Sequence, residues 1–153
     1  MAEFNAYADE TYAEEYLSLR LDTRAWDIAT EKEKQASLQM ASDDLDRLPL
    51  RGVRKTTVQQ RRFPRDYAAS SDVPEAVKQA CVELALEYLK GADSQEEYSL
   101  LTRQNSQYAT IREQRDPQNM EPHIVAGIPS LRAFNLMVPF LRDERGARLV
   151  RGS

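Results

Sequence analysis

Basic side chains concentrate in one short segment, where they could bind an anionic partner. Residues 47–65 contain no acid and seven bases: Arg47, Arg51, Arg54, Lys55, Arg61, Arg62 and Arg65. Such a cluster could contact the phosphates of a nucleic acid, with Phe63 and Tyr67 as stacking surfaces for bases. It could also pair with acidic protein surfaces, or lie in solvent without a partner. Residues 1–46 hold four bases and twelve acids. A neighbouring copy would therefore supply an acidic complement, and we favour protein contacts.

The C-terminal residues carry a similar basic pattern. From Arg142 onward an arginine recurs at every third position, and an apolar pair lies between the last two arginines. An extended segment of this kind could add as a strand to the edge of a partner's sheet, or it could be an unstructured terminus. The candidate partner-binding residues of this tail are Arg145, Arg148, Leu149, Val150 and Arg151.

No arrangement of residues predicts catalysis or metal binding. The chain has one histidine, His123, and one cysteine, Cys81, which lies on the apolar stripe of a predicted helix. A metal site needs several converging donors, and the acids at 43, 44 and 46 lack the glycine-containing spacing of a calcium-binding loop. We therefore expect no enzyme, no cofactor and no metal. No apolar stretch is long enough to span a bilayer, so we expect no membrane partner.

Helical periodicity predicts the elements that position these residues. Apolar side chains recur at helical spacing over 7–19, 30–48, 73–90 and 131–141. Thr30 and Glu33 form a capping-box pattern at the start of the second helix, and Pro139 should shorten or bend the last. Trp26 should enter the core from a connection. Residues 50–72 show no sustained period and predict a long loop, with a short extended piece around 56–60.

These elements indicate a mainly α fold, a small bundle of about four helices. The bundle carries the long basic loop, a possible short β element and an extended C-terminal tail. We expect a single helical domain over 1–141 and a basic tail over 142–153. The apolar content of 41% and charged content of 30% fit either a chain that completes its burial in an assembly or a monomer with a well-solvated surface.

The order of several motifs resembles the head–tail connector, or adaptor, proteins of tailed bacteriophages. Some relatives of that family carry a DnaT-like single-stranded-DNA-binding label. The resemblance covers about residues 5–90 and returns at 130–141. It rests on Tyr7-Ala-Asp-Glu10, Asp22-Thr-Arg-Ala-Trp26, Leu48-Pro-Leu-Arg-Gly52, Phe63-Pro-Arg65, Val73-Pro-Glu-Ala-Val-Lys78, Ala85-Leu-Glu-Tyr-Leu89 and Leu136-Met-Val-Pro-Phe-Leu141.

The resemblance implies a structural virion protein without catalysis, made in the host cytoplasm and placed at the head–tail interface. Its partners would be its own copies in a ring, expected to be a dodecamer, the portal protein, and the next neck, stopper or tail protein. DNA would pass through the channel without sequence-specific binding. The basic loop and the tail would then contact neighbouring subunits or the portal.

Two alternatives remain open. One is a single-stranded-DNA-binding replication accessory protein, for which replacing Arg61 or Arg62 with alanine should weaken binding. The other is a regulatory or scaffolding factor.

Overall fold

The helical class predicted from periodicity is confirmed. A computed structural model describes residues 3–91 and 122–142. In this part of the chain the helices are α1 (Glu10–Leu17), α2 (Arg24–Asp27), α3 (Glu31–Asp46), α4 (Glu75–Leu89), α6 (Pro122–Val125) and α7 (Leu131–Met137), followed by a 3-10 turn, η2 (Val138–Phe140). The same residues contain no strand, and their β pairing is limited to two isolated bridges.

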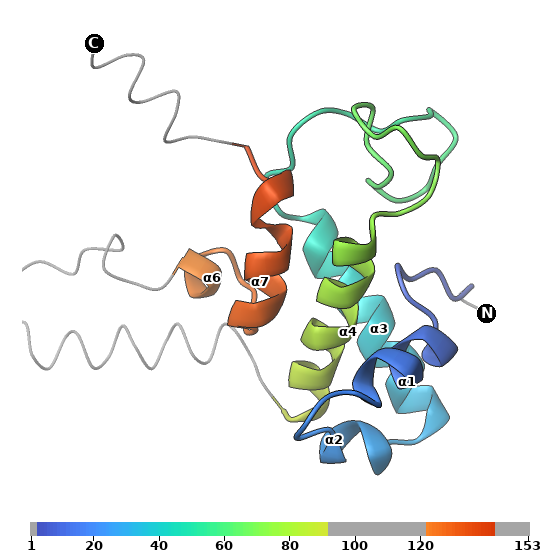
Figure 1. The fold of residues 1–153 in the computed structure, drawn as a ribbon, viewed down its shortest axis with the longest axis vertical. Coiled ribbons are helices and arrows are strands. Elements are labelled where there is room, and N and C mark those ends of the chain that lie inside the picture. The colour runs from blue at the N-terminus through green and yellow to red at the C-terminus, as the bar shows by residue number, and fades with distance from the viewer. Residues whose placement is uncertain (1–2, 92–121, 143–153) are drawn as a thin grey trace, which may run out of the picture.

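Helix α4 lies at the centre of the bundle. It packs against α3 on one side and α7 on the other (Figure 1). Its residues 80–86 are all buried, so it is enclosed far beyond the single stripe that the sequence pattern predicts. Pro74 stands at its N-cap, where a missing backbone donor costs the helix nothing. Gly91 follows its C-terminal end with a positive φ of 87°.

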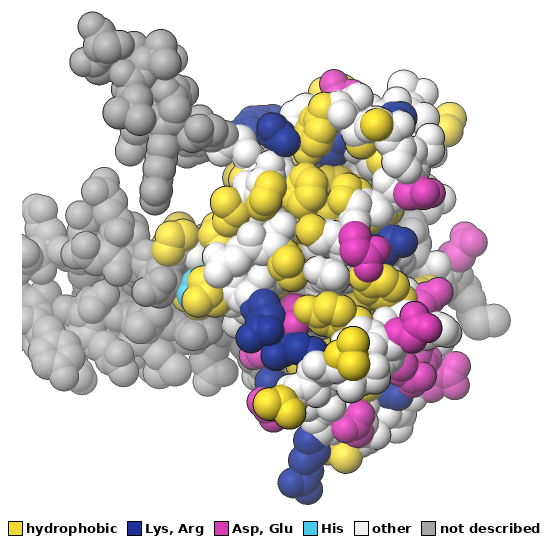
Figure 2. Space-filling model, viewed as in Figure 1, with side chains coloured by type: hydrophobic (Ala, Val, Ile, Leu, Met, Phe, Trp, Pro, Cys, Tyr) yellow, Lys and Arg dark blue, Asp and Glu magenta, His cyan; other side chains and the backbone are white. Residues whose placement is uncertain are grey.

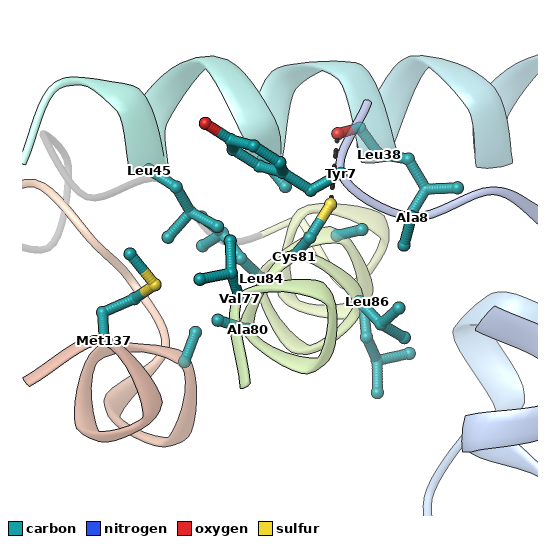
Figure 3. Close-up of a cluster of buried hydrophobic side chains, with 14 of the residues drawn as sticks. Tyr7, Ala8, Leu38, Leu45, Val77, Ala80, Cys81, Leu84, Leu86 and Met137 are labelled. Carbon is teal, nitrogen blue, oxygen red and sulfur yellow. Dashed lines mark hydrogen bonds between the residues drawn. The ribbon is translucent and has the colours of Figure 1, made fainter. Parts of the chain in front are cut away.

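The core forms where α3, α4, α7 and the chain before α1 meet (Figure 3). Leu38 and Leu45 of α3 face Cys81 and Leu84 of α4, and Met137 of α7 closes the far side. All five side chains have no exposed surface. Full burial of a Leu or Met side chain contributes about 1.5–3 kcal/mol, so this contact adds substantially to the stability of the bundle.

The N-terminal helices are arranged differently from the prediction. Helix α1 begins at Glu10 because the Asp9 carboxylate accepts a hydrogen bond from the Tyr12 amide. Tyr7 therefore lies outside the helix, although it is buried. The expected connection contains the short helix α2, and this helix carries Trp26 into the interior with 2% of its surface exposed. The burial predicted for Trp26 is confirmed.

The capping box at the start of α3 is confirmed. The Glu33 amide donates to the Thr30 hydroxyl at 3.3 Å, and the Thr30 amide donates to the Glu33 carboxylate at 2.7 Å. The Thr30 hydroxyl also donates to this carboxylate at 3.0 Å, and because the bonds from the Thr30 amide and hydroxyl favour the charged carboxylate, they lower the pKa of Glu33. Helix α3 ends at Asp46, slightly earlier than predicted.

The last helix is short, as Pro139 predicted. The Ser130 hydroxyl caps α7 by accepting from the Ala133 amide at 3.1 Å. Helix α7 ends at Met137, and Pro139 falls inside η2. The chain then pairs with the start of the long loop through an antiparallel bridge between Leu50 and Leu141.

Several expectations are not decided by this structure. The tail residues from 143 onward lie outside the described residues, so the division into a domain over 1–141 and a tail stays a prediction. None of the helices in the described ranges has the length and apolar character needed to cross a membrane.

Candidate nucleic-acid interface

The basic loop between α3 and α4 is folded around one of its own arginines. Arg65 is 2% exposed, and its guanidinium donates to the carbonyls of Arg51 and Arg62, each at 3.0 Å, and to that of Gly52. The two arms of the loop also pair directly, because the Lys55 amide donates to the Pro64 carbonyl at 3.0 Å. Without the Arg65 guanidinium these three carbonyls would lose their hydrogen-bond donor, which would destabilise the loop.

The prediction of an extended segment around residues 56–60 is wrong. The extended pairing occurs instead between Arg54 and Arg65, and residues 56–60 form the turn between the two arms. The Gln59 side chain holds this turn. Its Oε1 accepts from the Thr56 amide at 3.1 Å, and its Nε2 donates to the Pro64 carbonyl at 2.9 Å.

Arg61 ties the loop to α3 and to the N-terminal segment. Its guanidinium donates to Asp46 at 2.8 Å, to Asp43 at 3.0 Å and to the Asn5 carbonyl at 2.6 Å. Burial lowers the pKa of Arg61, but the hydrogen bonds to Asp46 and Asp43 outweigh burial, and the net effect raises it. Both partners belong to the acidic segment 1–46. The complement expected between neighbouring copies is thus present within a single chain.

Two further bases are engaged with loop carbonyls. Arg62 donates to the carbonyls of Asp46 at 2.8 Å and Leu48 at 2.9 Å. Lys55 donates to those of Ala68 at 2.7 Å and Ser70 at 2.9 Å. Both residues are therefore part of the loop's internal scaffold.

The loop and the end of the bundle together form an open groove of about 530 Å³, here called the basic groove. Its lining residues are Gly52, Val53, Arg54, Thr56, Thr57, Arg62, Arg65 and Arg142. Four of the eight are arginines and none is an acid. Among them Arg54 and Arg142 are exposed, and the Thr57 hydroxyl adds a neutral donor. This combination suits an anionic ligand with several phosphates.

Backbone pairing brings Arg142 to this groove. The Arg51 amide donates to the Phe140 carbonyl at 2.9 Å, and the Arg142 amide donates to the Pro49 carbonyl at 2.9 Å. The Arg142 side chain also donates to the Leu50 carbonyl at 3.2 Å. Sequence reasoning did not include Arg142, Thr56 or Thr57 among the candidates. Arg142 comes from a distant part of the chain, and the two threonines carry no charge that would mark them in the sequence.

The electrostatics of the groove favour a bound anion. Burial lowers the pKa of Arg65, and the nearby charge of Arg62 lowers it further. A bound phosphate would offset the repulsion between the charges of Arg62 and Arg65. Figure 2 shows Lys and Arg side chains where the loop meets the end of α7, whereas many of the visible acids lie over α1 and α3.

The structure places the other predicted residues as follows. Arg51 is exposed beside the groove, with its guanidinium 4.5 Å from the centre of the Tyr67 ring. Arg47 is exposed and pairs with Asp44 at 3.0 Å. The remaining candidates lie outside the described residues: Arg145, Arg148, Leu149, Val150 and Arg151. Phe63, expected as a stacking surface, is 3% exposed and packs edge-on against Tyr7 and Phe140.

The two residues considered for catalysis or metal binding, Cys81 and His123, are both buried. Cys81 is buried beside the Ser42 hydroxyl at 3.2 Å, and burial raises the pKa of its thiol. Within residues 3–91 and 122–142, no group of three His, Cys, Asp or Glu side chains is placed to hold a metal ion.

The chain matches the model of a known protein family. The model of a family described as "Putative DnaT-like ssDNA binding protein" matches residues 1–117. No curated protein matches the chain, and no solved structure does.

This match contradicts the head–tail connector interpretation. The matched family is described by single-stranded-DNA binding, and nothing in the comparisons indicates a virion component. The portal and the ring of subunits therefore have no support as partners. The motifs that suggest a connector are short, and charge counts alone do not distinguish a protein partner from DNA.

Proposed function

The chain belongs to the family of DnaT-like ssDNA-binding proteins, and on that basis we propose that it binds single-stranded DNA in the basic groove. The observation that carries the assignment is the lining of this groove, which has four arginines and no acid. Proteins that bind single strands without sequence preference commonly use a positively charged groove that follows the phosphate backbone. The same properties suit the groove to that role.

The arginines of the groove have different parts in this proposal. Arg54 and Arg142 are exposed and would contact phosphate oxygens directly, Arg142 through the guanidinium nitrogens other than the Nε that donates to the Leu50 carbonyl. Arg62 and Arg65 are held by loop carbonyls, so they would contribute charge from fixed positions. Fixed charges favour binding because little side-chain entropy is lost when the strand arrives.

The proposed role is binding without catalysis. The one cysteine and the one histidine are buried, and the groove is lined by arginine, threonine, valine and glycine. This set offers hydrogen-bond donors and positive charge but no general base that titrates near neutral pH.

Replacing Arg54 with glutamine tests the proposal. The affinity for a fluorescent oligo(dT) strand, measured by anisotropy, should fall by up to about fivefold, the upper end of the range for one exposed charge pair. The slope of log affinity against log salt concentration should also become shallower by about 0.7, because one fewer counterion is released from the single strand.

Arg24→Gln is the matched control. Arg24 is equally an exposed arginine, but it lies on α2 at the opposite end of the molecule (Figure 1). Its replacement makes the same change in net charge and should leave both the affinity and the slope unchanged. Equal losses in the two variants would show that binding follows net charge rather than the groove. Absence of binding by the unaltered protein at low salt would reject the proposed function.

A further inference from the structure

One exposed aromatic ring lies directly beside the basic groove. Tyr67 is 44% exposed, and Arg51 covers part of its ring with the guanidinium 4.5 Å from the ring centre. Because Phe63 is buried, Tyr67 is the aromatic residue of this loop that a ligand can reach. A cation over one part of an aromatic ring is attracted to the ring face and helps to fix the ring's orientation.

Gly52 lets the ring approach the groove so closely. A Cβ atom at this position would lie 3.0 Å from Cδ1 and 3.1 Å from Cε1 of Tyr67. It would also overlap the Asp66 carboxylate, and the backbone there has a φ of 74°. Only glycine adopts this conformation without strain. Since Gly52 itself lines the groove, the Tyr67 ring is adjacent to the arginines that would hold phosphates.

The acid nearest to this arrangement is engaged with the backbone. The Asp66 carboxylate accepts from the Val53 amide at 3.0 Å, and the Asp66 amide donates to the Val53 carbonyl at 2.9 Å. These bonds fix the loop on both sides of the ring and leave the carboxylate occupied. The ring is therefore held by its neighbours on the loop rather than by the ligand.

We propose that Tyr67, with Arg51, forms a stacking platform for one unpaired base and makes the site prefer single strands over duplex. This inference rests on the proposed function and adds that the protein recognises the bases of the strand as well as its phosphates. Phosphates are common to single strands and duplexes, so the arginines alone do not distinguish them. An exposed base face is available only in a single strand, and an aromatic ring stacks with any base.

The test compares two oligonucleotides of equal length and equal phosphate number. One is oligo(dT), and the other carries abasic tetrahydrofuran sugars at every position. The unaltered protein should bind oligo(dT) about 5- to 150-fold more tightly, the range expected for stacking of one base. Tyr67→Ala should bind both strands with the affinity that the unaltered protein shows for the abasic strand. Tyr67→Phe keeps the ring and should keep the preference.

Phe4→Ala is the matched control, because Phe4 is 43% exposed and does not line the basic groove. It should retain the full preference for bases.

Unchanged affinity of Tyr67→Ala for the abasic strand shows that the loop is still folded, which separates stacking from a structural role. Equal affinity of the unaltered protein for both strands would overturn the stacking proposal while leaving phosphate binding intact. Lack of binding to either strand would overturn both proposals. Loss of the preference in Phe4→Ala but not in Tyr67→Ala would place the platform elsewhere.

Discussion

The basic residues of the loop differ in what they contact, although the sequence presents them as one cluster. Arg61, Arg62 and Arg65 donate to carboxylates or carbonyls of the same chain. Arg54 is exposed and lines the basic groove. The first three shape the loop, and residues such as Arg54 are available to a ligand. Mutations in the two groups should therefore have different consequences.

Arg61→Gln should destabilise the fold. Arg61 bridges Asp43, Asp46 and the Asn5 carbonyl, and its side chain is only 11% exposed. A neutral replacement leaves the Asp46 carboxylate without its cation, at a cost of roughly 2–3 kcal/mol for lost hydrogen bonds between charged groups. The midpoint of urea unfolding should fall accordingly.

Arg54→Gln is the matched comparison for stability, because it removes the same charge from an exposed site. The free energy of unfolding of this variant, obtained from its urea midpoint, should differ from that of the unaltered protein by no more than about 0.5 kcal/mol. If Arg61→Gln kept the stability of the unaltered protein and lost only DNA affinity, Arg61 would be a ligand contact and the structural role assigned to it here would be wrong.

Charge counts could identify the basic loop but not the task of each residue in it. The segment 47–65 is conspicuous in the sequence, and it does contain most of the groove. The internal role of Arg65 depends on where the carbonyls of Arg51, Gly52 and Arg62 point, and only the folded loop determines this. Arg142 joins the groove through a contact between residues 92 positions apart, and no local pattern reports such a contact.

At the scale of elements, local signals succeeded where the chain is helical. Thr30 and Glu33 correctly mark the start of α3, and Pro139 correctly limits the last helix. Helix α2 was missed because four residues are too few to show a period. The loop arrangement was missed because side-chain-to-carbonyl bonds hold it together, and these follow no repeating spacing.

Two tyrosines on α1 donate hydrogen bonds to glutamates on α4. One of them, Tyr16, should make the stability of the fold depend on alkaline pH. The Tyr16 hydroxyl donates to Glu83 at 2.8 Å. Burial, then the hydrogen bond and the charge of Glu83, raises the pKa of Tyr16 from 10.0 to about 12. The folded state thus retains a proton that the unfolded state loses first. The stabilisation is complete below pH 10 and is lost as the pH rises from 10 to about 12.

Tyr16→Phe removes this titrating group. At neutral pH the variant should be less stable by about 1 kcal/mol, the typical net value of a hydrogen bond. Above pH 10 its melting temperature should fall less steeply than that of the unaltered protein. Glu83 keeps its ion pair with Arg20 at 3.0 Å in the variant, so the comparison isolates the tyrosine. Parallel melting curves across the alkaline range would contradict the assignment.

Across the molecule's described residues, bases without neighbouring acids gather at the loop end, whereas Figure 2 shows Lys and Arg side chains interspersed with acids in the lower half of the view. The described part of the segment 1–46 forms α1, α2 and α3, and none of its acids lines the basic groove. Arg61 neutralises two acids at the boundary between the two regions. A polyanion approaching the protein should therefore be repelled from the end that carries α1 and α2 and attracted to the groove.

This arrangement predicts where a bound strand will protect the backbone. Most amides of the loop are not part of a helical hydrogen-bond ladder, so they should exchange hydrogen quickly in the free protein. Oligo(dT) should slow exchange in residues 50–67 and at Leu141 and Arg142, because these segments form the groove and its rim. Exchange in α1 and α2 should not change, since they lie at the opposite end (Figure 1). Hydrogen-exchange mass spectrometry with and without the strand measures both regions together. Protection of α1 and α2 without protection of the loop would place the DNA on the acidic face, which the charge distribution disfavours.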